Sequence, residues 1–198
     1  MRYTSECLFR FEAPPMKPAL IFWPLLCCFL SLHPPVTEQA PRANLSILTW
    51  GGEGADRATD LALDAYGNVY ITGLFAGTAD LDPGPAVRIY TSSGENDLFL
   101  TKIAPAAAGE VEWTHVWGGS GPEKGAKVAV QASGIFYVVG SIAGKADLDP
   151  GDSVEFHQGH IFLAKYNTVG DFRWARTWGG SGTDGSFELS LDGSGSLL

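Results

Sequence analysis

Residues 113–119 read Trp-Thr-His-Val-Trp-Gly-Gly, and the pattern returns at residues 174–180 as Trp-Ala-Arg-Thr-Trp-Gly-Gly. A shorter copy, Trp-Gly-Gly, stands at residues 50–52. In an extended chain the two tryptophans of each long copy point to one side, because side chains alternate between the faces of a strand. Two indoles on one face bury a large apolar area, and a single pair of strands offers nothing to bury it against. The stretch therefore predicts strands that pack against a neighbouring sheet.

The residues between these tryptophans repeat as well. The motif Asp-Leu-Asp-Pro-Gly at residues 80–84 recurs letter for letter at residues 147–151, and Leu98–Lys102 is matched by Ile161–Lys165. Self-similarity of this kind is the sequence signature of a repeat architecture. We divide the chain into a leader at residues 1–40, a short lead-in at 41–47, two repeats at 48–113 and 114–174, and a truncated third repeat at 175–198.

Each repeat contains several short runs of β-branched and aromatic residues, separated by clusters of Gly, Asn, Asp, Ser and Pro. Such a pattern indicates strands joined by tight turns. The third and fourth strands of the first repeat are expected at residues 98–103 and 111–117, and Gly67 can take the positive φ that a hairpin loop requires. Four antiparallel strands with a stacking face describe one blade of a β-propeller. The predicted fold is all-β: a partial β-propeller of about two complete four-stranded antiparallel blades and the start of a third.

The leader does not follow the repeat pattern. The apolar run Ala19–Leu32 is shorter than the ~20 residues of a membrane-spanning helix, and Pro24 interrupts it. Lys17 precedes the run and a polar segment follows, which is typical of a secretory signal peptide. An uncleaved anchor is the alternative. The chain is therefore expected to be secreted or displayed on the cell surface.

Charge and cysteine usage narrow the function further. The chain carries a formal net charge of −9, which gives no basic stripe for nucleic acid and disfavours an anionic lipid surface. All three cysteines, Cys7, Cys27 and Cys28, lie in the leader, so the repeats contain neither a disulfide nor a cysteine metal site. Protein or glycan partners are expected instead.

The motif series of the first repeat resembles a known family. Trp-Gly-Gly at residues 50–52, then Asp-Ala-Tyr-Gly-Asn-Val-Tyr-Ile-Thr-Gly at 64–73, then Asp-Leu-Asp-Pro-Gly, then Leu-Phe-Leu-Thr-Lys at 98–102 is similar to the bacterial SBBP (seven-bladed beta-propeller) repeat family. The second repeat departs from the series at Gln131 and Ile135. The resemblance implies exported or cell-surface propellers, mostly without an assigned activity. It brings no catalytic residues to this chain.

The carboxylates of the repeated motif are the candidate site residues. Asp80 and Asp82, and likewise Asp147 and Asp149, stand two apart on an extended chain, so each pair projects to one side, and oxygen-rich sites suit Ca²⁺. The competing interpretation is a structural turn in which these side chains cap backbone N–H groups around Pro-Gly. Recurrence in both repeats and the small number of visible oxygens favour the turn. No cofactor is expected, with calcium as the alternative.

The sequence gives no sign of an enzyme. Catalytic groups break local symmetry, whereas the conspicuous residues of this chain repeat. The histidines that do not repeat, His115, His157 and His160, form no ligand-spaced set. The first hypothesis is thus a non-enzymatic binding scaffold. Two alternatives stay open: a propeller lyase or hydrolase whose catalytic residues lie outside this chain, and a calcium-dependent adhesion module.

The length bears on how a ring could close. Four blades of this size would need about 240 residues, and the chain has 198. We therefore expect a fragment of a longer propeller, completed by further blades or by other chains. The long loops at residues 83–96 and 150–159 are expected to present the binding face, because loops carry most binding residues.

Overall fold

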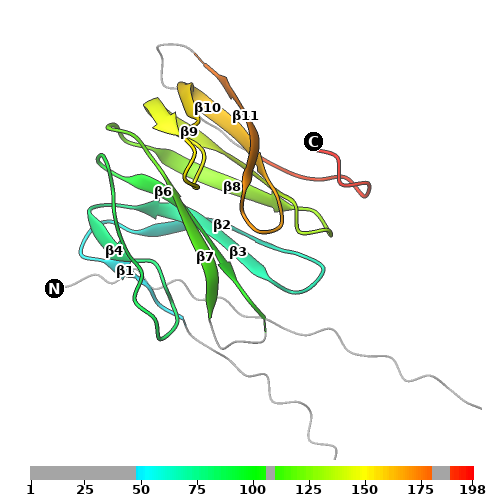
Figure 1. Ribbon diagram of the computed structural model, residues 1–198, viewed down its shortest axis with the longest axis horizontal. Coiled ribbons are helices and arrows are strands. Elements are labelled where there is room, and N and C mark those ends of the chain that lie inside the picture. Colours follow the sequence, from blue (N-terminus) through cyan, green and yellow to red (C-terminus); the bar gives the residue numbers. More distant parts are fainter. Residues whose placement is uncertain (1–47, 106–109, 180–187) are drawn as a thin grey trace, which may run out of the picture. The chain divides into compact units, whose positions relative to one another are not determined.

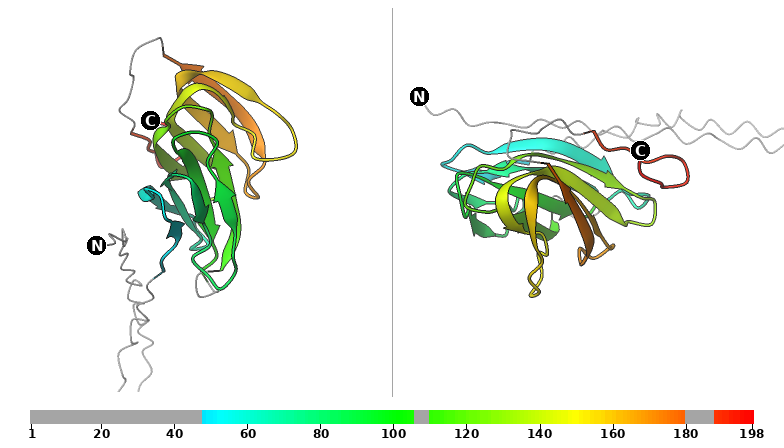
Figure 2. Two further views of the ribbon diagram at one scale, coloured as in Figure 1. Left: turned by 90° about the vertical axis from the view of Figure 1, so that its left-hand side faces the viewer. Right: turned by 90° about the horizontal axis from the view of Figure 1, so that it is seen from above.

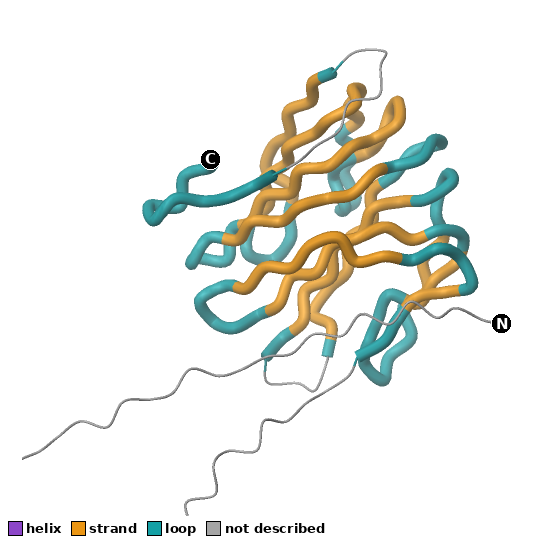
Figure 3. The backbone as a smooth tube through the Cα atoms, turned by 180° about the vertical axis from the view of Figure 1, so that it is seen from behind, coloured by secondary structure: helices purple, strands orange, loops and turns teal. Residues whose placement is uncertain are grey.

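The computed structural model describes residues 48–105, 110–179 and 188–198, and in this part of the chain every regular element is a strand (Figures 1 and 3). The strands are β1 (Gly51–Gly52), β2 (Arg57–Leu63), β3 (Val69–Phe75), β4 (Thr78–Asp80), β5 (Ile89–Thr91), β6 (Asp97–Ile103), β7 (Val111–Trp117), β8 (Lys124–Val130), β9 (Phe136–Asp147), β10 (Phe156–Tyr166) and β11 (Phe172–Trp178). They form three antiparallel sheets, and none of the three closes on itself. The all-β prediction is confirmed, whereas the predicted leader lies outside the described residues.

The two large sheets have the same design. One has the strand order β2-β3-β6-β7 and the other β8-β9-β10-β11, so that each is a meander of four strands taken in chain order (Figure 1). The strands expected at residues 98–103 and 111–117 are β6 and β7, and β6 begins one residue earlier than predicted. The repeat boundary that we placed between residues 113 and 114 falls inside β7. The sheet of the first repeat therefore ends a few residues after the boundary drawn from the sequence.

The segment between the second and third strands of each meander differs between the repeats. In the first repeat the chain turns at Gly77 (φ 68°), and β4 and β5 form a separate hairpin that pairs with β1. In the second repeat it bends at the matching Gly144 (φ 90°), and the same segment simply lengthens β9 and β10. Figure 2 shows the tip of this long hairpin standing out from its sheet. One motif therefore gives a small third sheet in one repeat and an extended hairpin in the other.

A single kind of turn recurs along the chain. Asp64 Oδ1 accepts hydrogen bonds from the amides of Tyr66 and Asn68, at 2.9 and 3.0 Å. Asn167 and Asp192 make the same pair of contacts in their own turns. The fourth residue of these three turns is a glycine with positive φ, as expected for Gly67, and so is the fourth residue of the matching turn that begins at Gln131; the glycines are Gly67, Gly134, Gly170 and Gly195. These turns fix where one strand stops and the next begins.

The core lies between the two four-stranded sheets. Trp117 of β7 is 1% exposed and its indole lies 5.5 Å from the ring of Tyr166 on β10, between ring centroids. Trp113, also on β7, is half-buried and stacks on Phe136 of β9, again at 5.5 Å. These aromatic rings share one buried cluster with apolar residues of both sheets. The prediction that paired indoles pack against a neighbouring sheet is confirmed for Trp113 and Trp117.

The matching indoles of the second sheet are placed differently. Trp174 is half-buried and contacts Tyr137 of its own sheet, at 6.2 Å between ring centroids. Trp178 is 50% exposed. Trp174 and Trp178 of the second sheet thus correspond to Trp113 and Trp117, which pack between the two sheets, but Trp178 is open to solvent.

Candidate functional site: the seam between the repeats

The predicted aspartates of the first repeat accept hydrogen bonds from backbone amides. Asp80 Oδ1 accepts from the amides of Asp82 and Arg88, at 3.1 and 2.9 Å, and Asp82 Oδ1 accepts from Gly84 at 2.7 Å. The second Asp82 oxygen pairs with the Arg88 guanidinium at 3.0 Å. These contacts are the ones that a capped structural turn requires.

The second repeat reproduces this network. Asp147 Oδ1 accepts from the amides of Asp149 and Glu155, at 3.1 and 2.9 Å, and Asp149 Oδ1 accepts from Gly151 at 2.9 Å. Glu155 stands where Arg88 stands in the first repeat, so the ion pair has no counterpart there. The two motifs lie on different hairpins, one on β4–β5 and the other on β9–β10. The structure does not bring their carboxylates together into one site.

The histidines do not assemble a metal site. His157 and His160 both lie on β10, and His115 of β7 stacks on Trp113 at 4.3 Å between ring centroids. Burial lowers the pKa of His115 to about 4, so its imidazole is neutral at pH 7. Within residues 48–105, 110–179 and 188–198, no group of three or more His, Cys, Asp and Glu side chains is placed to hold a metal ion.

The first strands of the two meanders meet along a polar seam. Thr59 Oγ1 of β2 donates a hydrogen bond to Ala126 O of β8 at 2.8 Å, and Asp60 Oδ2 accepts one from the Val128 amide at 3.0 Å. Asp60 Oδ1 also lies 3.6 Å from the Lys127 ammonium. Side chains therefore join two strand edges that share no backbone ladder.

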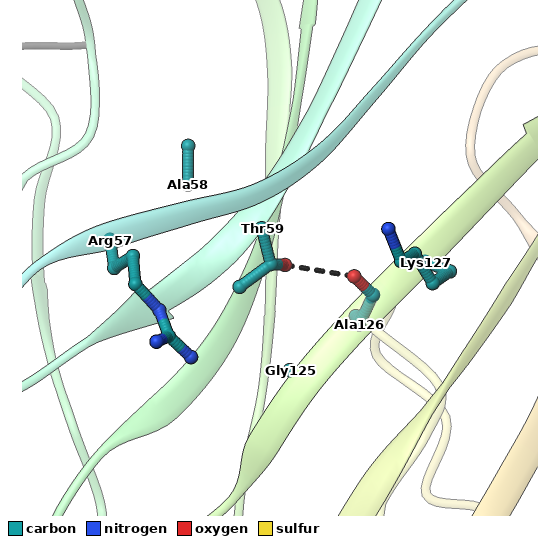
Figure 4. A pocket seen from close by; sticks show the side chains of 6 residues that line it. All are labelled: Arg57, Ala58, Thr59, Gly125, Ala126 and Lys127. Carbon is teal, nitrogen blue, oxygen red and sulfur yellow. Dashed lines mark hydrogen bonds between the residues drawn. The ribbon is translucent and has the colours of Figure 1, made fainter. Parts of the chain in front are cut away.

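A groove of about 380 Å³ opens along this seam. Its lining comes from β2 and β8 alone, namely Arg57, Ala58, Thr59, Gly125, Ala126 and Lys127 (Figure 4). In that view the Arg57 and Lys127 side chains lie on opposite sides of the Thr59–Ala126 hydrogen bond. Gly125 leaves the lining open, since a Cβ there would meet only Thr59 Cγ2, at 3.9 Å. The groove carries the Arg57 guanidinium on one side and, on the other, the Lys127 ammonium that already pairs with Asp60, so Arg57 is the cation better placed to bind a carboxylate.

Sequence reasoning missed this groove. It placed the binding face on the loops at residues 83–96 and 150–159, whereas the groove is built from strand residues. A signal was present in the sequence, because Arg57, Thr59 and Asp60 place polar groups in the first half of a strand, and Lys127 occupies the position of Asp60 in the next repeat.

Comparisons with protein-family models, with curated proteins and with solved structures found no match for this chain. Over the described residues there is no helix of the length and apolar character that a membrane crossing requires.

Proposed function

We propose that this chain is a section of an exported, non-enzymatic β-propeller of the SBBP repeat type, which binds protein or glycan at the cell surface. The repeated four-stranded meanders support this proposal, because such units are the blades from which propellers are built. The contact of β2 with β8 supports it too, since the first strands of neighbouring blades meet in such rings. Export rests on the leader sequence alone.

The observation that carries the proposal is the repetition of the packing residues. Trp117 is buried against Tyr166 of the next sheet, and its counterpart Trp178 lies on the second sheet with half of its surface exposed. In a stacked repeat scaffold, each repeat contacts its two neighbours through equivalent residues. Further blades, or other chains, would complete such a ring.

The groove at the seam gives the scaffold a chemical preference. Arg57 and Lys127 are two cations on a chain whose net charge is −9, and they flank one opening. Arginine binds carboxylates in bidentate fashion, and lysine adds a second positive charge. We propose that the ligand presents carboxylates, as an acidic polysaccharide or an acidic peptide segment does.

Retention of the full chain on alginate beads tests this function, because every sugar of alginate carries a carboxylate. Wild-type protein is expected to bind at low salt and to elute as ionic strength rises. The variant R57Q/K127Q should lose about tenfold or more in affinity, because each charged hydrogen bond contributes about 1.5–3 kcal/mol. Beads of neutral dextran should retain neither protein.

The variant R173Q/K145Q is the matched control, since it removes the same charge at exposed positions away from the groove. It should bind alginate like the wild type, and equal losses in both variants would contradict a site at the groove. Release of unsaturated or reducing sugar ends from soluble alginate would contradict the non-enzymatic assignment. That outcome would favour the lyase or hydrolase alternative.

A further inference from the structure

Two acidic side chains meet where the end of the first repeat touches the start of the second. Asn96 and Pro122 form a parallel bridge, so the residues that follow them, Asp97 and Glu123, lie side by side. Neighbouring side chains of a parallel pair project to the same face. The Cα atom of Gly118 abuts the Asp97 carboxyl, with no room for a Cβ between them. The two carboxyl groups thus lie near each other at the junction of the repeats, close enough for the charge of one to act on the other.

Both carboxyl groups are buried, and each lacks one hydrogen bond. Asp97 is 2% exposed and Glu123 is 1% exposed. Asp97 Oδ2 accepts from the Ser93 amide at 3.0 Å, and Glu123 Oε1 accepts from the Gly119 amide at 3.1 Å. The other two oxygens, Asp97 Oδ1 and Glu123 Oε2, are buried without a partner. Ionising both groups would therefore leave two buried charges near each other without enough hydrogen-bond donors.

The surroundings supply no compensating cation. The groups that donate to the pair are neutral: the backbone and hydroxyl of Ser93 and the backbone of Gly94 beside Asp97, and the backbone of Gly119 and Ala143 beside Glu123. Lys124 and Lys145 are exposed, and the Lys145 ammonium lies over the Phe156 ring, 3.7 Å from its centroid. No ion pair to either carboxyl group exists among the described residues. Two adjacent buried charges without a cation are costly, so one of them has to be neutralised.

We propose that Glu123 keeps its proton while Asp97 nearby is ionised, and that this proton makes the contact between the repeats sensitive to pH. When the proton leaves for solvent, two carboxylates face each other across the junction and the contact weakens. A Ca²⁺ ion is a poorer fit, because it takes about six to eight oxygens and the pair has two to offer.

The electrostatics agree with this geometry. Burial, and then the charge of Asp97, raise the pKa of Glu123 to about 7, from an ordinary value of 4.5. Burial also raises the pKa of Asp97. The folded protein therefore holds this proton more tightly than the unfolded chain does. The resulting stabilisation is complete below pH 4.5 and is lost as the pH rises through about 7.

Thermal unfolding of the full chain between pH 5.5 and 8 tests the proposal, with wild type, E123Q and D56N compared. The amide of E123Q is neutral at every pH, so its Tm should stay level where the wild-type Tm falls. We expect the difference between the two proteins to change by about 3 °C or more over this range. Asp56 accepts a hydrogen bond from the Gly52 amide at 2.6 Å, as Glu123 accepts one from the Gly119 amide. Asp56 is not part of the Asp97–Glu123 pair, so D56N should follow the wild-type pH profile.

A second measurement uses the wild-type protein alone, so it can be made even if the variant does not fold. In ¹³C NMR of protein labelled at glutamate carboxyls, one resonance should titrate with a midpoint near 7. If every glutamate titrates below pH 5, the proposal is wrong. It is also wrong if E123Q lowers Tm equally at pH 5.5 and 8, or if millimolar CaCl₂ raises the Tm of the wild type but not of E123Q, which would show a bound cation instead.

Discussion

At the scale of single residues, two repeated glycines lie under aromatic rings. A Cβ on Gly73 would clash with the Arg57 carbonyl oxygen and come within 2.7 Å of the Phe99 ring, and one on Gly140 would come within 2.9 Å of the Phe162 ring. Both rings are fully buried and have no space into which to move. The close approach of ring and backbone therefore explains why glycine occupies the same position in both repeats.

We expect G73A to destabilise the protein by about 1–3 kcal/mol, because overpacking a buried contact forces the ring or the strand to shift. Urea unfolding followed by tryptophan fluorescence measures the change. G125A is the control, since the nearest atom to its new methyl group would be 3.9 Å away. If G73A lowers the free energy of unfolding no more than G125A does, the contact at Gly73 can shift at little cost and our explanation is wrong.

His115 gives a residue-scale prediction about acid. Its pKa of about 4 lies below the ordinary value of 6.5, because burial disfavours the charged imidazolium. The unfolded chain then binds the proton more readily, so the stabilisation from neutral His115 is complete above pH 6.5 and is lost as the pH falls towards 4. The variant H115F keeps a ring beside Trp113 without a titrating group. Its unfolding free energy should fall less than that of the wild type between pH 6.5 and 4.5, and parallel losses would refute the assignment.

At the scale of elements, the Asp-Leu-Asp-Pro-Gly hairpins test the two interpretations of their aspartates. D147A removes the acceptor of two backbone amides, so we expect a loss of about 1–2 kcal/mol. Hydrogen exchange of the Asp149 and Glu155 amides should accelerate in this variant. If the side chains serve the turn, adding CaCl₂ should leave the wild-type Tm unchanged. A rise in Tm that D147A abolishes would favour a calcium site instead.

The strands followed from the sequence, whereas the contacts between elements did not. Residues 111–117 carry alternating aromatic residues and form β7 with the expected bounds, and the matching residues 172–178 form β11. The pairing of β1 with β4 could not be predicted, because Gly51–Gly52 has no side chains to give a strand signal. The Thr59–Ala126 contact was also hidden, since it depends on the approach of two strand edges that no backbone ladder joins. The repeat pattern did not single out Asp97 and Glu123 either, because His160 occupies the position of Asp97 in the second repeat.

At the scale of the whole molecule, the two sheet faces that carry tryptophans differ in what covers them. Trp117 lies in the main core among residues of both large sheets. Trp178 ends β11 with half of its surface exposed. Exposed indoles on a sheet are typical of surfaces that bind another unit. A scaffold built from stacked repeats would use this face for the next repeat or for another chain.

We therefore expect the full chain to self-associate with rising concentration, as measured by light scattering coupled to size exclusion. W178E should shift the distribution towards monomer without lowering Tm, because a charge on the exposed face disfavours association but leaves the core intact. W117A should instead cost about 3–5 kcal/mol of stability, since it opens a cavity in the main core. A wild-type protein that elutes as a sharp monomer at every concentration would contradict the stacking role of this face. If W178E and W117A lower the stability equally, Trp178 belongs to a core, as Trp117 does, and not to a docking surface.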